Sequence, residues 1–229
     1  MKTETLLSPL EATMTGTQAE RVLREQILDG RLEPGTHLRE TQLAASLGVS
    51  RNTLREAFRA LAEQGLVTHL PHRGVIVTDL TEQDIADLYR LRAVLELAAL
   101  REVDAPTLAE LERTTVTFAD ALACGDAVEA LECDFAFHRT LIDALGSRRL
   151  SAAYQRAQAE LRLALLQLDR KYEPPQVEEH RRIVDALRRR EPGDAADALR
   201  THLDRAAERL QRLIRDRVIP TRERRTTHA

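Results

Sequence analysis

The stretch from Ala44 to Gly74 constrains the fold of this chain more than any other. Gly48 can take the left-handed conformation that the corner of a helix–turn–helix requires, and the Ser50 hydroxyl can cap the helix that follows. In that helix apolar residues recur on one side and polar or basic ones fall roughly opposite: Leu54, Ala57, Phe58 and Leu61 against Arg51, Asn52, Arg55 and Arg59. The pattern predicts a DNA recognition helix, since Arg and Asn bind base edges and phosphates, although a surface helix with solvated arginines fits the periodicity equally well.

Two short runs of β-prone residues follow this helix and favour the DNA-binding interpretation. The first run contains Leu66, Val67 and His69, and the second is Val75–Val77. The basic tip Pro71–Gly74 connects them. A helix–turn–helix followed by such a hairpin predicts a winged helix.

Composition limits the possible functions. The net charge is −3, so nucleic-acid binding has to come from a local basic patch. The chain has 229 residues, 43% of them hydrophobic, which is enough to build one large or two small folded domains. Its two cysteines, Cys124 and Cys133, form neither a zinc pattern nor a disulfide framework. We find no bilayer-spanning apolar stretch and no signal peptide, and we therefore expect a cytoplasmic protein without a membrane partner.

After Thr81 the β-prone runs disappear, and Gly and Pro punctuation predicts six amphipathic helices at roughly 82–103, 107–123, 127–145, 148–171, 176–190 and 194–217. Short connectors between such helices indicate an antiparallel bundle. The predicted fold is thus mainly α: an N-terminal winged helix–turn–helix with a small β-hairpin wing (17–79) and a C-terminal six-helix bundle (80–218). Thr17 and Glu20 form a capping box for the first helix. We expect a flexible arm at 1–16 and a disordered tail at 219–229.

Three bundle helices carry a histidine on the stripe that should face inward. These are His138, His180 and His202, and Asp134 precedes His138 by one helical turn. Residues four apart point the same way, so Asp134 and His138 can reach one ion. Each histidine could instead be a core residue with its own partner, but one shared divalent metal would satisfy all of them. A nitrogen-rich site with one carboxylate suits Zn, Ni, Mn or Fe, and spacing does not choose among them.

Residues 18–77 resemble the DNA-binding domain of the GntR family of bacterial transcription regulators. The matching motifs are Ile27–Leu32, Pro34–Gly35, Leu43–Ala44, Leu47–Arg51, Leu54–Ala57, Gly65–Val67 and Gly74. Together with the helix pattern, the resemblance makes us expect DNA contacts from Ser50, Arg51, Asn52, Thr53, Arg55, Arg73 and Gly74. Two positions depart from the family pattern: Thr41 stands where some members use an arginine on DNA, and Asn52 where Thr is common.

Residues 82 to about 215 resemble the FCD domain, the all-helical effector domain of the FadR branch of this family, and the six helices resemble its VanR-like subgroup. The resemblance rests on Asp87–Tyr89, Arg92, Glu96, Asp134–His138, Glu179–His180, Ile183, Ala186, Ala198 and His202–Leu203. In metal-containing members an Asp and three His at these places hold a divalent cation in a pocket that binds small organic acids, often carboxylates. The resemblance therefore implies the ligands Asp134, His138, His180 and His202.

Two arginines are candidates for binding an anionic effector. Arg92 and Arg162 lie on helices that should line the bundle interior, where a carboxylate needs a counter-charge. The alternative is that both are solvated or paired with Glu96 and Glu160.

These observations predict a ligand-responsive, sequence-specific transcription regulator, a repressor that binds a palindromic double-stranded operator as a homodimer. We expect the first and fourth bundle helices to supply apolar surface to the dimer. Two alternatives stay open. One is a metal-dependent enzyme, disfavoured because no spare acid/base pair accompanies the four ligands, and the other is a DNA-binding protein with a purely structural metal.

Overall fold

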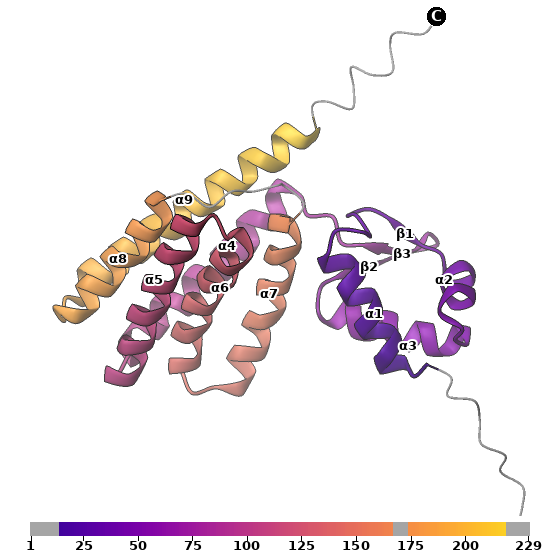
Figure 1. The fold of residues 1–229 in the computed structure, drawn as a ribbon, viewed down its shortest axis with the longest axis horizontal. Helices are drawn as coiled ribbons and strands as arrows, with labels where there is room; N and C mark the ends of the chain where they lie inside the picture. Colours follow the sequence, from indigo (N-terminus) through magenta and orange to yellow (C-terminus); the bar gives the residue numbers. More distant parts are fainter. Residues whose placement is uncertain (1–13, 167–173, 219–229) are drawn as a thin grey trace, which may run out of the picture. The chain divides into compact units, whose positions relative to one another are not determined.

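The structure of the protein, a computed structural model, describes residues 14–166 and 174–218 (Figure 1). The chain is divided into two compact units, one ending at Asp79 and the other beginning at Leu80. The boundary falls directly before the helix that Thr81 caps. The tail expected at 219–229 and most of the arm expected at 1–16 lie outside the described residues.

The N-terminal unit is a winged helix, as predicted. Its described elements in chain order are α1 (Gly16–Leu28), β1 (His37–Leu38), α2 (Glu40–Leu47), α3 (Arg51–Glu63), β2 (Val67–Leu70) and β3 (Gly74–Val77). Gly48 has φ 65°, the left-handed conformation expected at the corner between α2 and α3. The apolar side of α3, with Leu54 and Phe58 fully buried, packs toward α1, and its basic side is left exposed.

The first helix begins one residue before Thr17, and the predicted Thr17–Glu20 capping box is wrong. Thr15 is the N-cap: its hydroxyl accepts a hydrogen bond from the Gln18 backbone N–H, and the Gln18 side chain accepts one from the Thr15 N–H. The chain contains two overlapping capping-box patterns, and contact with α3 favours the earlier one. Gly16 lies so close to α3 that a Cβ there would meet Oε2 of Glu56 at 3.3 Å.

The wing contains one strand more than the predicted hairpin. Its described sheet has the antiparallel order β1-β3-β2, with Val67 opposite Val77 and His37 opposite Ile76. The two residues of β1 are too few to show an alternating pattern, so no strand signal is readable there from the sequence. Pairing with β3 alone makes this segment a strand.

The C-terminal unit is a helical bundle, and six α-helices are found among its described residues, as predicted. They are α4 (Glu82–Ala99), α5 (Ala105–Cys124), α6 (Ala127–Ala144), α7 (Arg148–Leu166), α8 (Pro174–Arg188) and α9 (Pro192–Val218). The first ends earlier than expected and tightens into a 3₁₀ turn, η1 (Leu100–Glu102). Prolines begin α8 and α9. Proline has no backbone N–H, and at the first helical positions the N–H would make no hydrogen bond within the helix, so nothing is lost there. The last residues predicted for the fourth helix, 167–171, lie outside the described part.

The core of the bundle lies where α6 passes between α4, α5 and α7 and where α8 and α9 pair (Figure 1). Phe137, Leu141 and Leu199 are fully buried there. Helical periodicity places Val128 on the same inward stripe of α6 as His138, but this prediction is wrong, because Val128 is 70% exposed. It lies in the first turn of α6, and residues 123–129 are exposed as a whole, so no neighbouring helix covers that end of the stripe. Among the described helices, none combines the length and the apolar character needed to cross a membrane.

Candidate metal centre and DNA-binding helix

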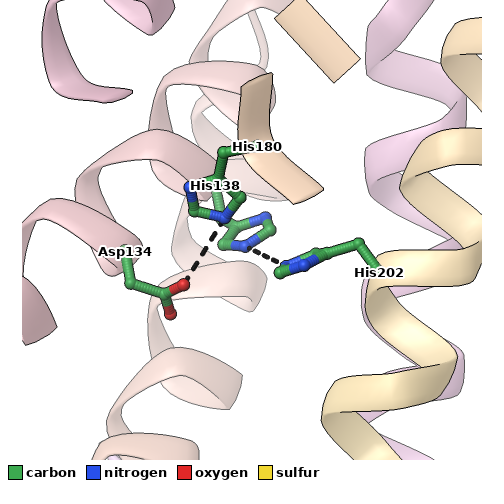
Figure 2. A group of neighbouring side chains, drawn as sticks. All are labelled: Asp134, His138, His180 and His202. Atoms are coloured by element: carbon green, nitrogen blue, oxygen red, sulfur yellow. Dashed lines mark hydrogen bonds and ion pairs between the residues drawn. The ribbon is translucent and has the colours of Figure 1, made fainter. Parts of the chain in front are cut away.

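Three helices bring Asp134, His138, His180 and His202 together inside the bundle. α6 supplies the first two from adjacent turns, α8 supplies His180 and α9 supplies His202. All four side chains are buried, and one potential ligand atom from each lies within 4.8 Å of those of the others (Figure 2). Their spacing in the sequence places these residues on inner stripes, and the packing of the helices makes the stripes meet at one point.

The ring nitrogens face one another across a small gap. Nε2 of His138 lies 3.1 Å from Nε2 of His202, and Nε2 of His180 lies 3.5 Å from Oδ1 of Asp134, the two pairs joined by dashed lines in Figure 2. The rings of His138 and His202 are stacked with their centroids 5.1 Å apart. The four potential ligand atoms therefore converge on one point from three helices, α6, α8 and α9.

Behind two of the histidines lie buried carboxylates. Oε2 of Glu96 is 2.7 Å from Nδ1 of His138, and Oε2 of Glu179 is 2.9 Å from Nδ1 of His202. Burial opposes ionisation of Glu96, but the charges and hydrogen bonds of Arg92 and His138 outweigh it and lower its pKa to about 2. Burial likewise opposes ionisation of Glu179, and hydrogen bonds from His202 and Arg209 lower its pKa to about 2. Both groups are therefore ionised acceptors.

Ionised acceptors at Nδ1 decide which nitrogen of each ring carries hydrogen. Each Nδ1–H is donated to its carboxylate, so in a neutral ring Nε2 is a bare lone pair. Burial lowers the pKa of His138 and so favours its neutral form. The lone pairs of His138 and His202 thus point at each other across 3.1 Å, an arrangement that a cation between them would relieve.

His180 is the least satisfied of the three histidines. Neither of its ring nitrogens has a hydrogen-bond partner among the described residues, although the side chain is fully buried. Burial lowers its pKa well below the ordinary value, and the positive charges that His202, His138 and Arg92 can carry lower it further. The ring is held by stacking on Phe137, with centroids 4.1 Å apart. A buried imidazole that makes no hydrogen bond and lies beside a carboxylate has a nitrogen lone pair that a metal ion could use as a ligand. The residues present therefore fit a divalent metal.

Arg92 lies beside this centre and is only 4% exposed. Its Nε donates a 2.8 Å hydrogen bond to Oε1 of Glu96, and its guanidinium lies over the ring of Tyr89 at 4.9 Å. Nη2 is buried and has no hydrogen-bond partner among the described residues. The pairing with Glu96 that the sequence left as an alternative is present, and one donor of the arginine is left over.

Arg162 on α7 pairs with Glu132 on α6, so the alternative pairing with Glu160 is wrong. Glu160 instead binds Arg156, one helical turn before it. The Arg162 guanidinium lies 5.8 Å from the centre of the Phe135 ring, and its buried Nε has no partner among the described residues.

The sequence pattern predicts no role for Glu96 or Glu179 at the metal centre. Both are among the residues that carry the family resemblance, and Glu96 is also a possible partner of Arg92. A signal existed for Glu179, which directly precedes His180, and for Glu96, which stands four residues after Arg92. Spacing along a helix, however, does not predict a partner on another helix.

The second candidate surface is the exposed side of α3. Ser50 caps this helix by accepting a 3.0 Å hydrogen bond from the Thr53 N–H, and Arg51 and Asn52 are exposed in its first turn. Arg55 is held by Glu40 of α2, with Nε 3.0 and 3.1 Å from the two carboxylate oxygens. The ion pair orients Arg55 on the outer side of the helix.

The wing tip places Arg73 in the exposed turn between β2 and β3. His72 has φ 60° and Gly74 has φ 85°, so two left-handed residues flank it. Its backbone N–H donates to the Leu70 carbonyl at 3.1 Å, which closes the turn and leaves the Arg73 side chain exposed. The seven residues expected to contact DNA thus lie at the start of α3, along its exposed side and at the wing tip.

A winged helix with an exposed arginine- and asparagine-bearing helix, joined to an all-helical domain with a buried polar centre, defines a class of protein: a transcription regulator with its own effector domain. Residues 15–77 match the family model described as bacterial regulatory proteins, gntR family, and residues 87–205 match the FCD domain. The chain belongs to the GntR family of transcription regulators, in the branch that carries an FCD domain. Such proteins bind operator DNA and small-molecule effectors, the latter through the FCD domain. They are not enzymes, which excludes the enzymatic alternative.

Known proteins of this family are similar to the chain over much of its length. The HTH-type transcriptional repressor RspR of Escherichia coli is 27% identical, over 93% of this chain and 95% of that protein. The gluconate operon transcriptional repressor of Bacillus subtilis is 34% identical, over 59% of this chain and 57% of that protein. A crystal structure of a GntR transcriptional regulator from Rhodococcus sp. RHA1 superimposes with a TM-score of 0.72 at 32% identity, covering 85% of this chain and 96% of that one.

Proposed function

We propose that this regulator is a homodimeric repressor that holds one divalent metal in its FCD domain and releases its operator when a small organic acid binds there. The observation that carries the proposal is the buried group of Asp134, His138, His180 and His202, with ligand atoms within 4.8 Å of one another. Four side-chain ligands leave coordination positions open on an octahedral ion. A bound metal would supply a Lewis-acidic point of attachment for an effector carboxylate.

The arginines beside the centre support an anionic effector. Arg92 keeps a buried Nη2 without a partner and Arg162 a buried Nε, among the described residues, so each has a donor to offer a carboxylate. Arg92 also interacts electrostatically with Asp134, which places its charge near the four ligands. The gluconate operon repressor of B. subtilis is named for a sugar acid, and gluconate carries the carboxylate that this site requires.

For the operator, we propose that Arg51, Asn52 and Arg55 read base edges in the major groove while Ser50 and Thr53 contact phosphate. Arg73 and Gly74 would contact the backbone or minor groove from the wing. Arg55 is already held by its ion pair with Glu40, which lowers the conformational entropy lost when it binds DNA. A base that accepts two hydrogen bonds from the Arg55 guanidinium would either replace the Glu40 carboxylate as its partner or bind alongside it.

For the dimer, we propose that the exposed surface of α4 and α7 is buried against a second copy of the chain. Val94 of α4 is 67% exposed and Leu91 37% exposed. A shallow groove of about 270 Å³ runs between α4 and α7, lined by Asp84, Asp87, Leu88, Leu91, Ala153, Arg156, Ala157 and Glu160. Apolar side chains bordered by charges are typical of a dimer contact.

The experiment that tests the function joins metal content to DNA release. Genomic fragments selected by the purified protein provide the operator, and fluorescence anisotropy measures its affinity. Elemental analysis gives the bound metal, a chelator removes it, and Zn, Ni, Mn and Fe are added back in turn. Small carboxylic acids, gluconate among them, should weaken operator binding by the metal-loaded protein only.

Two other outcomes decide against parts of the proposal. A metal-loaded protein whose operator affinity no acid changes would indicate a purely structural metal. A protein that takes up none of the four metals would leave the histidines as core residues.

A further inference from the structure

Two of the three histidines in the candidate centre are held from behind by a carboxylate on a different helix. Glu96 on α4 binds His138 on α6 at 2.7 Å, and Glu179 on α8 binds His202 on α9 at 2.9 Å. In both cases the carboxylate reaches Nδ1, the nitrogen that points away from the gap. The same arrangement occurs twice, on two different pairs of helices.

Each carboxylate is itself immobilised. Glu96 is fully buried, and its Oε1 accepts hydrogen bonds from Nε of Arg92 and from the Tyr154 hydroxyl, both at 2.8 Å. Glu179 is 6% exposed and accepts longer hydrogen bonds, 3.3 to 3.4 Å, from Arg205 and Arg209. These contacts hold the two acceptors in place, so neither can swing away from its histidine without breaking several hydrogen bonds.

We infer that Glu96 and Glu179 are positioning residues that commit His138 and His202 to presenting Nε2 to a cation. By accepting the Nδ1–H, each carboxylate selects the ring tautomer whose free lone pair faces the centre. It also fixes the plane of the ring and increases the basicity of the ligand nitrogen. The inference rests on the proposed metal site and adds the residues that prepare it.

His180 differs from His138 and His202 in this respect. It has no such carboxylate behind it, and neither ring nitrogen makes a hydrogen bond within the described part of the chain. Its ring is confined by Phe137 at 4.1 Å and Phe118 at 5.3 Å, contacts that restrict position without selecting a tautomer. In His138 and His202 the carboxylate thus fixes in advance which ring nitrogen coordinates the cation. In His180 that nitrogen is determined only when the cation binds.

Glu179 is the better residue to change, because Glu96 also neutralises the buried Arg92. In Glu179→Leu the Nδ1 acceptor of His202 disappears while the side-chain volume stays similar. Glu179→Gln keeps a carbonyl oxygen that can accept the same hydrogen bond. Glu112→Leu is the matched control, since Glu112 on α5 is a partly exposed carboxylate that pairs with Arg188 on α8.

Two measurements are made on each variant. Competition with a zinc chelator gives the Zn²⁺ affinity, and ¹⁵N-histidine NMR of the metal-free and zinc-loaded protein reports which ring nitrogen carries hydrogen. We expect Glu179→Leu to bind Zn²⁺ about 10–100-fold more weakly than wild type, as for other outer-shell changes. His202 should lose its Nδ1–H form in this variant while His138 keeps it. Glu179→Gln should recover the His202 tautomer and part of the affinity, and Glu112→Leu should match wild type.

The outcomes separate this inference from the proposed function. If wild type binds Zn²⁺ and Glu179→Leu binds it equally well with an unchanged His202 tautomer, the inference is wrong and the metal site stands. If wild type binds no metal, the proposed site is wrong. The tautomer of His202 in metal-free protein, with and without Glu179, still decides whether the carboxylate positions the ring.

Discussion

The Nε2 atoms of His138 and His202 lie 3.1 Å apart, although the two residues are 64 positions apart in the chain. Their Nδ1 atoms are turned outward to Glu96 and Glu179, so the inner nitrogens meet without a hydrogen to share in the neutral rings. The pair joins α6 to α9. A cation bound there would link the two helices, and stability should therefore depend on it.

Metal removal should lower the stability of the helical domain, and His180→Ala should strongly reduce that dependence. A ligand present at ~100 times its Kd stabilises the folded state by about 2.7 kcal/mol, so wild type should gain a free energy of unfolding of that order when loaded. The variant should gain much less because it lacks one ligand. Thermal unfolding with and without chelator measures the difference.

The matched control for this variant is His69→Ala, which removes an exposed histidine of the wing. It should retain the full metal dependence. Wild-type protein that unfolds at the same temperature with and without its metal would contradict the prediction.

Arg55→Ala should weaken operator binding by about 1–3 kcal/mol and relax the preference at one base pair, as expected for a base-reading arginine. Binding to random DNA should change less, because base contacts carry the sequence preference. Fluorescence anisotropy on operator and random duplexes measures both. Arg101→Ala, which removes an exposed arginine of the other unit, is the control; unchanged operator affinity in Arg55→Ala would refute the assignment.

Arg92→Met should destabilise the protein by about 3–5 kcal/mol, because it leaves the buried carboxylate of Glu96 without its positive partner. Denaturant unfolding measures the loss. Replacing Glu96 by Leu in the same chain should restore part of it, since the uncompensated charge is then gone. Arg90→Met, which changes an exposed arginine two positions away, is the control and should have little effect on stability. An equally small loss of stability in Arg92→Met would show that the buried pair of Arg92 and Glu96 contributes little.

Arg162→Met should weaken the response to carboxylic acids while leaving the fold intact. The arginine is partly exposed and pairs with an exposed glutamate, so its loss leaves no buried charge behind. Thermal shifts and operator release with gluconate, compared between variant and wild type, test the role. A variant whose response equals that of wild type would remove Arg162 from the effector site.

Val94→Glu should convert the proposed dimer to a monomer. The valine is 67% exposed on α4, and a buried charge at the proposed contact would be unfavourable. Sedimentation should show wild type near twice 25.8 kDa and the variant near 25.8 kDa. Val116→Glu, at a similarly exposed valine of α5, should remain dimeric; a monomeric wild type at micromolar concentration would contradict the proposal.

The sequence by itself determined the features that depend on near neighbours in the chain. Gly48 and Ser50 are turn and cap residues whose preferences act locally, and the structure has the turn and the cap where they predict them. Asp134 and His138 share one side of α6 because any helix places residues four apart on one side. For the same reason, helical periodicity placed His180 and His202 on inner stripes.

Only the tertiary structure decided which residues from distant segments meet. Glu96 and Glu179 reach histidines on other helices, and Arg162 pairs with Glu132 rather than with the nearer Glu160. Likewise β1 is a strand because β3 lies beside it. Periodicity tells which way a side chain points but not what lies opposite, since that depends on how far each helix slides and turns when the apolar stripes pack together.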